Sequence, residues 1–458
     1  MKRGLLLMGL LAGLTLGAVA QKVLTFEDAV KLALDNSVLL NQQKNNLEYN
    51  QMQKTSSIAS IGPSVTLGGT AQQFNGNSFN QQQGRVIIGV RDNVSGSINA
   101  NMNLFSGFAR INSIRQYSNL ADAQSYFVKR TAQDAINTVA GQYLTVMLDV
   151  ELLRIARQNF EALNKQLDQV KEQVRLGAKS PVDEYNQDAL TKAAELRMVQ
   201  AEVNLNNDKT TLTQSLLMDP FEQYDVEKPA WDLNKLGYDG LTMEDLAEKA
   251  KAQRGDYQRA VSSELSAKFG MRASRGFNMM PSVYLFGSYG SSYNFAHDQP
   301  DSVQVNGVMV RNQASFSDQF KTNNVYKAYG IQVNIPLFNG LQYRTTVAQQ
   351  KALYENAQWT KKSLEYQIKN DVIRAVRNYE AARKAYQVSV DQLTAAEAAF
   401  ELEKERYNLG VTNFVDFTNA NRVLVQAQTD KAQNEYKLVF QRISIEYAVG
   451  TLKADDLE

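Results

Sequence analysis

The sequence predicts an α+β membrane protein in which a long α-helical coiled-coil barrel continues into a transmembrane β-barrel, with four strands contributed by each chain. Three observations predict this fold. The chain begins with an export signal, its body is duplicated, and its hydrophobic period changes from seven residues in long segments to two residues in short ones. The seven-residue period is typical of packed helices and the two-residue period of strands.

The N-terminus has the features of a secretory signal peptide over residues 1–20. Lys2 and Arg3 form a basic start, and the apolar stretch Leu5–Leu16 is too short to cross a bilayer. The small residues Ala18–Ala20 match a cleavage site, so we expect the mature chain to begin at Gln21. This pattern predicts an exported protein.

Composition excludes several function classes. The chain has no cysteine, one histidine (His297), and 49 basic against 48 acidic residues. Without cysteine there is no disulfide framework or thiolate metal site, and a single histidine offers little for acid–base catalysis. A balanced charge gives no electrostatic footprint for nucleic acid. We therefore expect no enzyme activity, no cofactor, no metal site and no nucleic-acid partner.

An internal repeat organises the mature chain. Leu104–Gly107 recurs as Leu337–Gly340 at an offset of 233 residues, and the same offset relates Gly177 to Gly410 and Asp183 to Asp416. The predicted domains are a signal peptide (1–20), a first repeat (21–220), a linker at mid-height (221–240), a second repeat (241–452) and a tail (453–458).

Each repeat predicts one long helix and two shorter ones. Large apolar residues recur every seven positions from Val139 to Val174, and again from Val372 to Tyr407, which favours coiled-coil packing. No proline interrupts residues 109–175 or 343–409, so each forms a rod about 100 Å long. The shorter helices are expected over residues 25–60 and 182–218 and, in the second repeat, over 242–279 and 415–450.

Four segments have the alternation of strands of roughly ten residues. Apolar and polar residues alternate over Val94–Leu104 and Tyr329–Leu337, and Val65 and Val283 open the partner strands. One apolar and one Asn/Ser/Gln face favours a lipid-exposed outside and a wet lumen, with soluble hairpins as the alternative. The polar stretches at 72–93 and 293–324, which include His297, are expected to be surface loops.

Four strands cannot close a membrane barrel, because the smallest have about eight. An open sheet edge is not tolerated in hydrocarbon, so the chain must share its barrel with further copies of itself. This argument requires an oligomer but leaves the number of copies open. The mature chain has no apolar run near the ~18 residues that a membrane-spanning helix requires.

Five motifs, in this order, resemble the TolC family of outer-membrane efflux proteins over essentially the whole mature chain. They are Leu24–Val30, Leu104–Gly107, Arg175–Asp183, Pro336–Gly340 and Arg406–Asp416. The resemblance implies a homotrimer with a twelve-stranded barrel in outer-membrane lipid and a helical tunnel in the periplasm. It also implies the exit duct of a tripartite efflux or secretion system, loaded by an inner-membrane RND or ABC pump through a periplasmic adaptor protein. The alternative is an exported coiled-coil structural or adhesive surface protein.

The resemblance also implies roles for residues at the helix tips. The gate at the periplasmic aperture would comprise Asp416, Asp183, Tyr407, Thr412, Asn413 and Asn419, and the turns that contact the adaptor would comprise Leu176, Gly177, Ala178, Leu409, Gly410 and Val411. Asp416 matches a ring of carboxylates at the aperture, while Tyr407 and Asp183 match positions that hold the closed tips together.

Two positions depart from the best-known member of this family. Thr412 replaces an arginine and Asn419 replaces a second aspartate, so Asp183 lacks its expected cationic partner. Hydrogen bonds through Thr412, Asn413 or Asn419 would then hold the tips. A structural role is the alternative for Asp183 and Asp416, because each lies in the first turn of a helix, where a carboxylate caps exposed N–H groups.

Overall fold

A computed structural model describes residues 22–80, 85–228, 242–297, 299, 302–305, 307–311 and 313–453. The expected signal peptide, residues 229–240 of the expected linker and residues 454–458 of the expected tail lie outside these described residues. Within the described part of the chain, every helix is too short or too polar to cross a bilayer.

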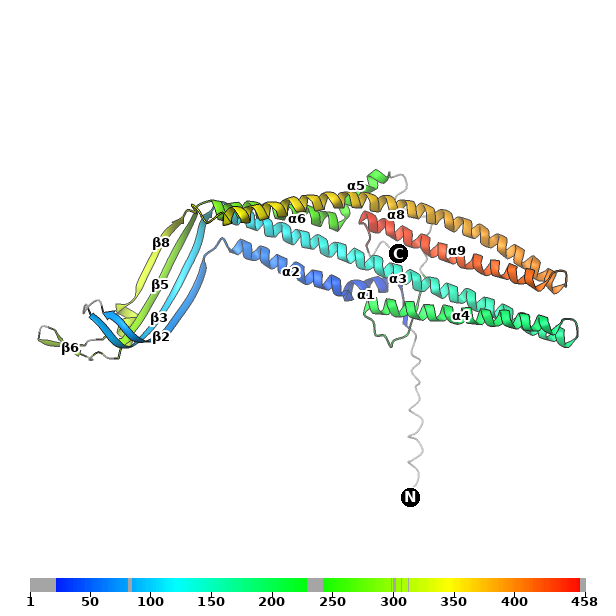
Figure 1. The fold of residues 1–458 in the computed structure, drawn as a ribbon, viewed down its shortest axis with the longest axis horizontal. Helices are drawn as coiled ribbons and strands as arrows, with labels where there is room; N and C mark the ends of the chain where they lie inside the picture. Colours follow the sequence, from blue (N-terminus) through cyan, green and yellow to red (C-terminus); the bar gives the residue numbers. More distant parts are fainter. Residues whose placement is uncertain are drawn as a thin grey trace, which may run out of the picture. The chain divides into compact units, whose positions relative to one another are not determined.

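The chain divides into two compact units, and each draws on both repeats (Figure 1). The helical unit comprises the described residues up to Asn45, Tyr126–Gln258 and Ser363 onwards. The sheet unit comprises Asn46–Ser125 and Arg259–Lys362. The duplication therefore does not correspond to two separately folded halves, and the predicted repeat boundaries stay a prediction.

The long helices form over the residues that the heptads predict. The helices and strands that lie wholly or partly in the helical unit are β1 (Lys22–Leu24), α1 (Phe26–Asn36), α2 (Val38–Ala59), α3 (Ala109–Arg175), α4 (Pro181–Leu216), β4 (Tyr224–Val226), α5 (Met243–Gln253), α6 (Gly255–Met279), α8 (Gln342–Asn408) and α9 (Phe414–Val449). The predicted single helices 25–60 and 242–279 are each divided in two, at Ser37 and Arg254. Each division lets the short first helix turn its apolar face into the core, as Phe26 and Val30 of α1 do.

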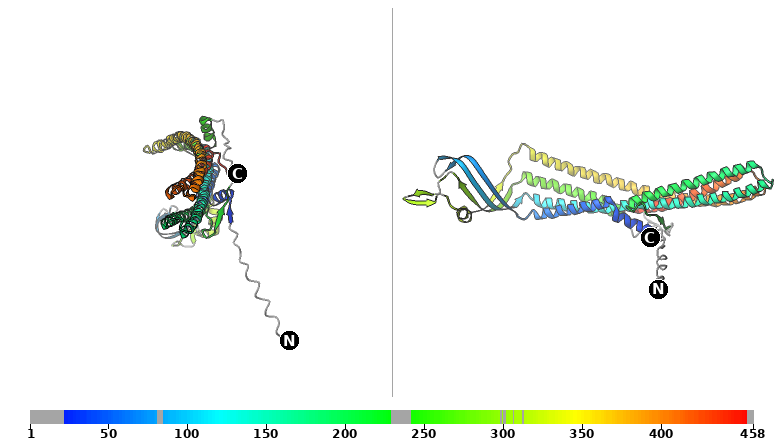
Figure 2. Two further views of the ribbon diagram at one scale, coloured as in Figure 1. Left: turned by 90° about the vertical axis from the view of Figure 1, so that its right-hand side faces the viewer. Right: turned by 90° about the horizontal axis from the view of Figure 1, so that it is seen from below.

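Three hydrophobic clusters occur among the described residues of the helical unit, the smallest of them at the hairpin tips. The first joins α1, α3, α4 and α9 around Tyr143, whose hydroxyl donates to the carbonyl oxygens of Leu24 and Glu227. The second joins α5, α8 and α9 through Ile368, Val372 and the alanines beside them. Figure 2 shows the hairpins α3–α4 and α8–α9 from two further sides. Because α9 contributes to both clusters, it packs between α8 and α3, while α8 and α4 are the outer helices.

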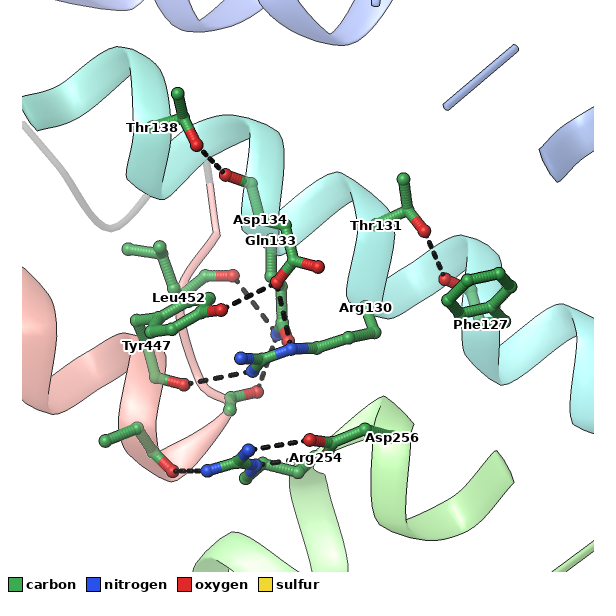
Figure 3. A network of polar contacts seen from close by, with 12 residues as sticks. Phe127, Arg130, Thr131, Gln133, Asp134, Thr138, Arg254, Asp256, Tyr447 and Leu452 are labelled. Carbon is green, nitrogen blue, oxygen red and sulfur yellow. Dashed lines mark hydrogen bonds and ion pairs between the residues drawn. The ribbon is translucent and has the colours of Figure 1, made fainter. Parts of the chain in front are cut away.

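A polar network anchors the C-terminal end of α9 (Figure 3). Arg254 donates to the carbonyl of Ala448 at 3.4 Å, and Arg130 donates to that of Tyr447 at 3.4 Å. Gln133 donates to the carbonyl of Gly450 at 2.8 Å. These side chains satisfy carbonyls that a helix end leaves without partners.

The ionic groups of this network are themselves paired. Arg254 forms ion pairs with Asp256 at 2.6 Å and Asp371 at 3.1 Å. The hydroxyl of Tyr447 donates to Asp134 at 2.8 Å, and burial raises the pKa of this phenol to about 12. The end of α9 is therefore held by charged groups from α3, α8 and the α5–α6 corner.

The sheet unit contains one four-stranded antiparallel sheet, in the order β2-β3-β5-β8. Its strands are β2 (Ser64–Asn80), β3 (Arg85–Ser106), β5 (Ser282–Ala296) and β8 (Tyr326–Asn334), and the remaining elements are β6 (Ser302–Val305), β7 (Val308–Arg311), α7 (Phe316–Asp318) and η1 (Gln319–Asn323). The expected length of roughly ten residues is confirmed for β8, which has 9 residues, but β2, β3 and β5 are longer, with 17, 22 and 15 residues. The surface loop expected at 72–93 is wrong. The ladder between β2 and β3 continues to Asn80↔Arg85, because alternating polar residues also pair well in a hairpin.

The second predicted loop, 293–324, contains a segment that covers an open edge of β5. The pairing of β5 with β8 ends at Gly290. Beyond that point the side-chain amides of Gln313 and Gln319 each exchange two hydrogen bonds with the backbone of Ala296 and Asn294, at 2.7–3.1 Å. Asn324 donates to the carbonyl of Ser292 at 2.7 Å. Three amides thus take the place of a neighbouring strand along this edge.

One face of the sheet is apolar, and the part of the chain that the structure describes leaves it exposed. Leu67, Ile98, Leu285, Tyr329 and Ile331 lie on this face, and all are exposed. The opposite face carries polar groups such as Ser288, whose hydroxyl donates to Asn99 at 2.7 Å. This alternation is the one expected from the sequence.

Candidate gate at the helical hairpin tips

The two hairpin turns end their long helices in the same way. In the first turn, the N–H of Gly177 donates to the carbonyl of Val174 at 2.9 Å and that of Ala178 to Gln173 at 2.8 Å. In the second turn, Gly410 and Val411 donate to Tyr407 and Arg406 at 3.1 and 2.9 Å. Gly177 and Gly410 have φ angles of 76° and 73°, a left-handed conformation that favours glycine.

The adaptor-contact residues named from the sequence lie on these turns. Leu176, Leu409 and Val411 are exposed, and Leu409 retains 79% of its accessible surface. Apart from the adjacent residues of the chain, no atom of the described residues lies within 4 Å of the Cβ position at either Gly177 or Gly410. The turns therefore present apolar side chains outward without covering them.

Both aspartates are hydrogen-bonded to their own helix start. The carboxylate of Asp183 accepts from the backbone N–H of Ser180 at 3.0 Å. Asn413 caps α9 by accepting from the N–H of Asp416 at 2.9 Å, and Thr412 donates its hydroxyl to the carboxylate of Asp416 at 3.1 Å. Asp183 therefore has the capping role that was left open, whereas the carboxylate of Asp416 bonds to a side chain and remains exposed to solvent.

The hydrogen bonds expected to hold the tips stay local in the described residues. Thr412 and Asn413 bond to Asp416 on their own hairpin, and Asn419 accepts from Arg422 at 2.9 Å, one turn further along α9. Among the residues expected at the gate, Tyr407 is the closely packed one, because only 5% of its surface is exposed.

An aromatic cluster joins the two hairpins at Tyr407. Its ring stacks on Phe417 at 4.9 Å between centroids and packs with Leu163 of α3 and Ala194 of α4. The ammonium of Lys179, in the first turn, lies 3.8 Å from the centre of the Tyr407 ring. The Tyr407 hydroxyl is buried and has no hydrogen-bond partner within the described residues.

This cluster contains the residues that sequence reasoning missed. Phe414 continues the seven-residue step of Phe400 and Tyr407 into the next helix, so its packing could have been predicted. Lys179 gave no such signal, because its contact with Tyr407 depends on how the two hairpins meet. The best-known family member has an arginine where this chain has Thr412. Lys179 supplies a positive charge instead, but its ammonium contacts an aromatic ring and not a carboxylate.

Polar contacts extend the join between the hairpins beyond the aromatic cluster. Asn421 of α9 donates to Asn159 of α3 at 3.2 Å, and Gln166 of α3 donates to Asn408 at 3.5 Å. Each of these hydrogen bonds joins a side-chain amide of α3 to a side-chain amide of the second hairpin.

Comparison with known proteins identifies the family. The sequence pattern of the family described as "Outer membrane efflux protein" matches residues 29–216 and 278–451, which is most of the chain. The chain belongs to the outer membrane efflux protein family. The resemblance seen in the sequence is confirmed, and the chain is an outer-membrane protein.

Among named relatives, the chain is similar to outer membrane efflux protein BepC of Brucella suis, with 21% identity over 446 residues, covering 95% of this chain and 89% of that protein. It is 22% identical to outer membrane protein TolC of Vibrio cholerae over 80% of this chain and 78% of that protein. For TolC of Escherichia coli the identity is 22%, and the chain spans 65% of that relative's length.

Solved channel structures share the fold. The CmeC outer membrane channel of Campylobacter jejuni superposes with a TM-score of 0.79 at 14% identity, covering 94% of this chain and 88% of that one. VceC of Vibrio cholerae gives 0.78 at 14% identity, covering 93% and 96%. The predicted α+β channel fold is confirmed by this likeness.

Proposed function

We propose that the chain is one protomer of a trimeric exit duct in the outer membrane, gated at its periplasmic hairpin tips. An inner-membrane RND or ABC pump loads this duct through a periplasmic adaptor protein. Membership of the efflux family supports the roles of exit duct and of partner to an adaptor and a pump. The exposed apolar sheet supports assembly into a trimer. The observation that carries the proposal is a four-stranded sheet with an exposed apolar face and two outer strands, β2 and β8.

Strand pairing between copies of the chain would complete the hydrogen bonding of this sheet. Lipid covers an apolar face at no cost, but the unpaired N–H and C=O groups of an outer strand are costly in hydrocarbon. Pairing β8 of one copy with β2 of the next supplies the missing hydrogen bonds. The contact is head-to-tail, so repetition closes a ring, and three copies make twelve strands.

The outer helices support the same arrangement. On α4, the exposed apolar residues Val182, Leu196 and Val203 lie at multiples of seven positions. On α8, exposed Val388 and Leu402 are likewise two steps of seven positions apart. Two heptad seams without a partner, one on each outer helix, suit a coiled-coil contact between α4 of one copy and α8 of the next.

Opening then requires α4 and α9 to move relative to α3 and α8 at the tips. The contact to be loosened is the one between Lys179 and the Tyr407 cluster, while the network at Arg254 holds the far end of α9 as a pivot. An adaptor that engages the exposed Leu176 and Leu409 turns supplies the free energy by binding the open state better than the closed one.

Single-channel recording in planar bilayers tests the gate. Asp416→Ala removes a carboxylate ring from the aperture, so we expect a higher conductance or weaker block by multivalent cations. Glu184→Ala, which alters another acid in a first helical turn, serves as the control and is expected to leave both unchanged. Equal conductance and equal cation block in wild type and Asp416→Ala would remove Asp416 from the gate.

The assembly and the partners have separate tests. Native mass spectrometry of the detergent-solubilised protein is expected to give a trimer, and a monomer as the main species would contradict the shared barrel. Loss of the gene is expected to sensitise cells to a panel of toxic compounds. Capture with the intact protein is expected to retain an adaptor, and Leu176→Asp with Leu409→Asp should lose it.

A further inference from the structure

A polar cavity lies in the sheet unit, where the helices meet the strands. Its volume is about 450 Å³, and it lies between the end of α2, the start of α3 and the end of α6. Its lining consists of Gln53, Ser56, Ser57, Ser60, Arg110, Ser113, Tyr117 and Phe277. This volume is within the usual range for small-ligand sites.

Arg110 is the one charged residue of the lining, which contains no carboxylate. One terminal nitrogen of its guanidinium donates to the carbonyl of Ser60, at the end of α2. Its Nε–H is buried and has no partner among the described residues. The guanidinium therefore brings a positive charge that no acidic side chain of the cavity neutralises.

Hydroxyl groups surround this charge. Those of Ser57 and Ser60 donate to carbonyls of α2, at 2.7 Å each. For Ser56, Ser113 and Tyr117, the described part of the chain offers no side-chain hydrogen bond. A guanidinium with several hydroxyl donors beside it is the chemistry that recognises phosphate oxygens.

Exposed apolar residues lie next to the lining residues along the chain, and we call them the rim of the cavity. They are Ile58 and Ile61 at the end of α2 and just after it, Phe108 and Ile111 at the start of α3, and Phe277, itself part of the lining, near the end of α6. β2 begins at Ser64 and β3 ends at Ser106, so this rim is immediately next to the strands. A polar cavity with an apolar rim at the border of a membrane-facing sheet suits an amphiphile with a phosphate head.

The second repeat does not contain this set of residues. Tyr343 corresponds to Arg110, Met271 to Gln53, and Asn278 to Ser60. The fold forms in both repeats, so the basic cavity is not a requirement of the shared architecture. A function specific to the first repeat accounts for it.

We propose that this cavity binds the phosphate of a phospholipid headgroup from the outer membrane, with Arg110 and the hydroxyls of Ser56, Ser113 and Tyr117 on the phosphate oxygens and the acyl chains over the apolar rim. The inference rests on the outer-membrane location and does not depend on the gate. Free phosphate offers the same oxygens, so the test must distinguish the two sources.

The test titrates the intact detergent-solubilised protein with three probes, followed by native mass spectrometry. The probes are dihexanoylphosphatidylglycerol, the diacylglycerol that lacks its phosphate, and inorganic phosphate. We expect the phospholipid to bind and the diacylglycerol not to. Arg110→Gln is expected to weaken phospholipid binding about tenfold, the usual effect of losing a charged hydrogen bond. Arg344→Gln, at the exposed start of α8, is the matched control and should bind as wild type does.

A second variant separates binding from folding, because Arg110 also caps α2. Ser113→Val narrows the cavity without removing the contact between Arg110 and Ser60, and it is expected to weaken binding as well. Equal phospholipid binding by wild type, Arg110→Gln and Ser113→Val would overturn the site. Inorganic phosphate that binds as tightly as the phospholipid, with the same dependence on Arg110, would overturn the lipid assignment.

Discussion

The two hairpin turns have almost the same backbone and very different side chains. Both close with a left-handed glycine, and both place an aspartate three residues after the helix cap. The first turn adds Lys179 and Pro181, where the second has Thr412 and Phe414. The first is therefore a polar turn with a cation, and the second continues an aromatic cluster.

This difference shows which positions of the turn were able to diverge after the duplication. The glycines and caps satisfy backbone groups within each turn, so neither copy can lose them without cost. The other positions meet residues of the opposite hairpin, and there the copies have diverged into complementary partners. The ammonium of Lys179 on the Tyr407 ring is the clearest case.

The largest expected effect is at the aromatic cluster. Tyr407→Ala leaves a cavity among Leu163, Ala194 and Phe417 and is expected to lower the free energy of unfolding by about 3–5 kcal/mol. Tyr407→Phe is the control: it removes a buried hydroxyl without a described partner, so stability should be equal or higher. Guanidinium titration at fixed protein and detergent concentration measures both. A loss with Tyr407→Phe as large as with Tyr407→Ala would contradict this packing.

A carboxyl pair gives a second difference between the repeats. Burial, together with the neighbouring Asp208 carboxylate, which accepts a hydrogen bond from the protonated Asp149 carboxyl, raises the pKa of Asp149 to about 7, whereas the second repeat has Ala382 and Gln441 at these positions. The folded state holds the proton more tightly than the unfolded chain, in which the pKa is about 3.9. Stability is therefore expected to fall as pH rises from about 4 to about 7. Unfolding measured across this range should lose that slope in Asp149→Asn, and an unchanged slope would exclude the pair as its source.

Substitution of the glycine in each turn tests whether the two turns have the same backbone requirement. Gly177→Ala and Gly410→Ala each force a Cβ into the left-handed region, and each is expected to cost about 1–2 kcal/mol. Because nothing lies near either Cβ position, the two losses should agree within about 0.5 kcal/mol. Thermal unfolding of the two variants checks this, and a clearly unequal pair would reveal a contact at one tip.

Replacing the aspartate near each helix cap should lower stability by unequal amounts. Asp183→Ala removes the acceptor for the N–H of Ser180, with an expected loss of about 1 kcal/mol. Asp416→Ala leaves the cap of Asn413 in place, so a loss of only about 0.5 kcal/mol is expected. The same unfolding experiment compares them, and the reverse order would mean that Asp416 is the stronger structural residue.

A similarly small effect is expected at Lys179. Lys179→Met keeps the apolar stem and removes the charge above Tyr407, for an expected loss of about 0.5–1 kcal/mol. A double-mutant cycle with Tyr407→Leu isolates the pair. If the contact also holds the gate, Lys179→Met raises the open probability in bilayer recordings. A coupling free energy of zero would mean that the two groups do not interact.

Local patterns predicted the long helices and the turns. The seven-residue period from Val139 to Val174, within a segment that contains no proline, predicts α3 as one helix, because coiled-coil packing repeats along one helix. Gly177 and Gly410 likewise predict the ends of α3 and α8, since a left-handed residue is a local requirement. Three of the four strands are longer than expected because alternation does not indicate where pairing stops, as the ladder up to Asn80↔Arg85 illustrates.

The sequence by itself determined the long helices, the turns, the capping by Asp183 and the family, because each depends on neighbouring residues or on their order along the chain. Only the tertiary structure decided which distant groups meet. Lys179 lies on Tyr407, Gln319 pairs with the edge of β5, and Arg254 holds the end of α9. These contacts join residues that no period or motif relates, so they exist only once the packing of the helices and strands has brought them together.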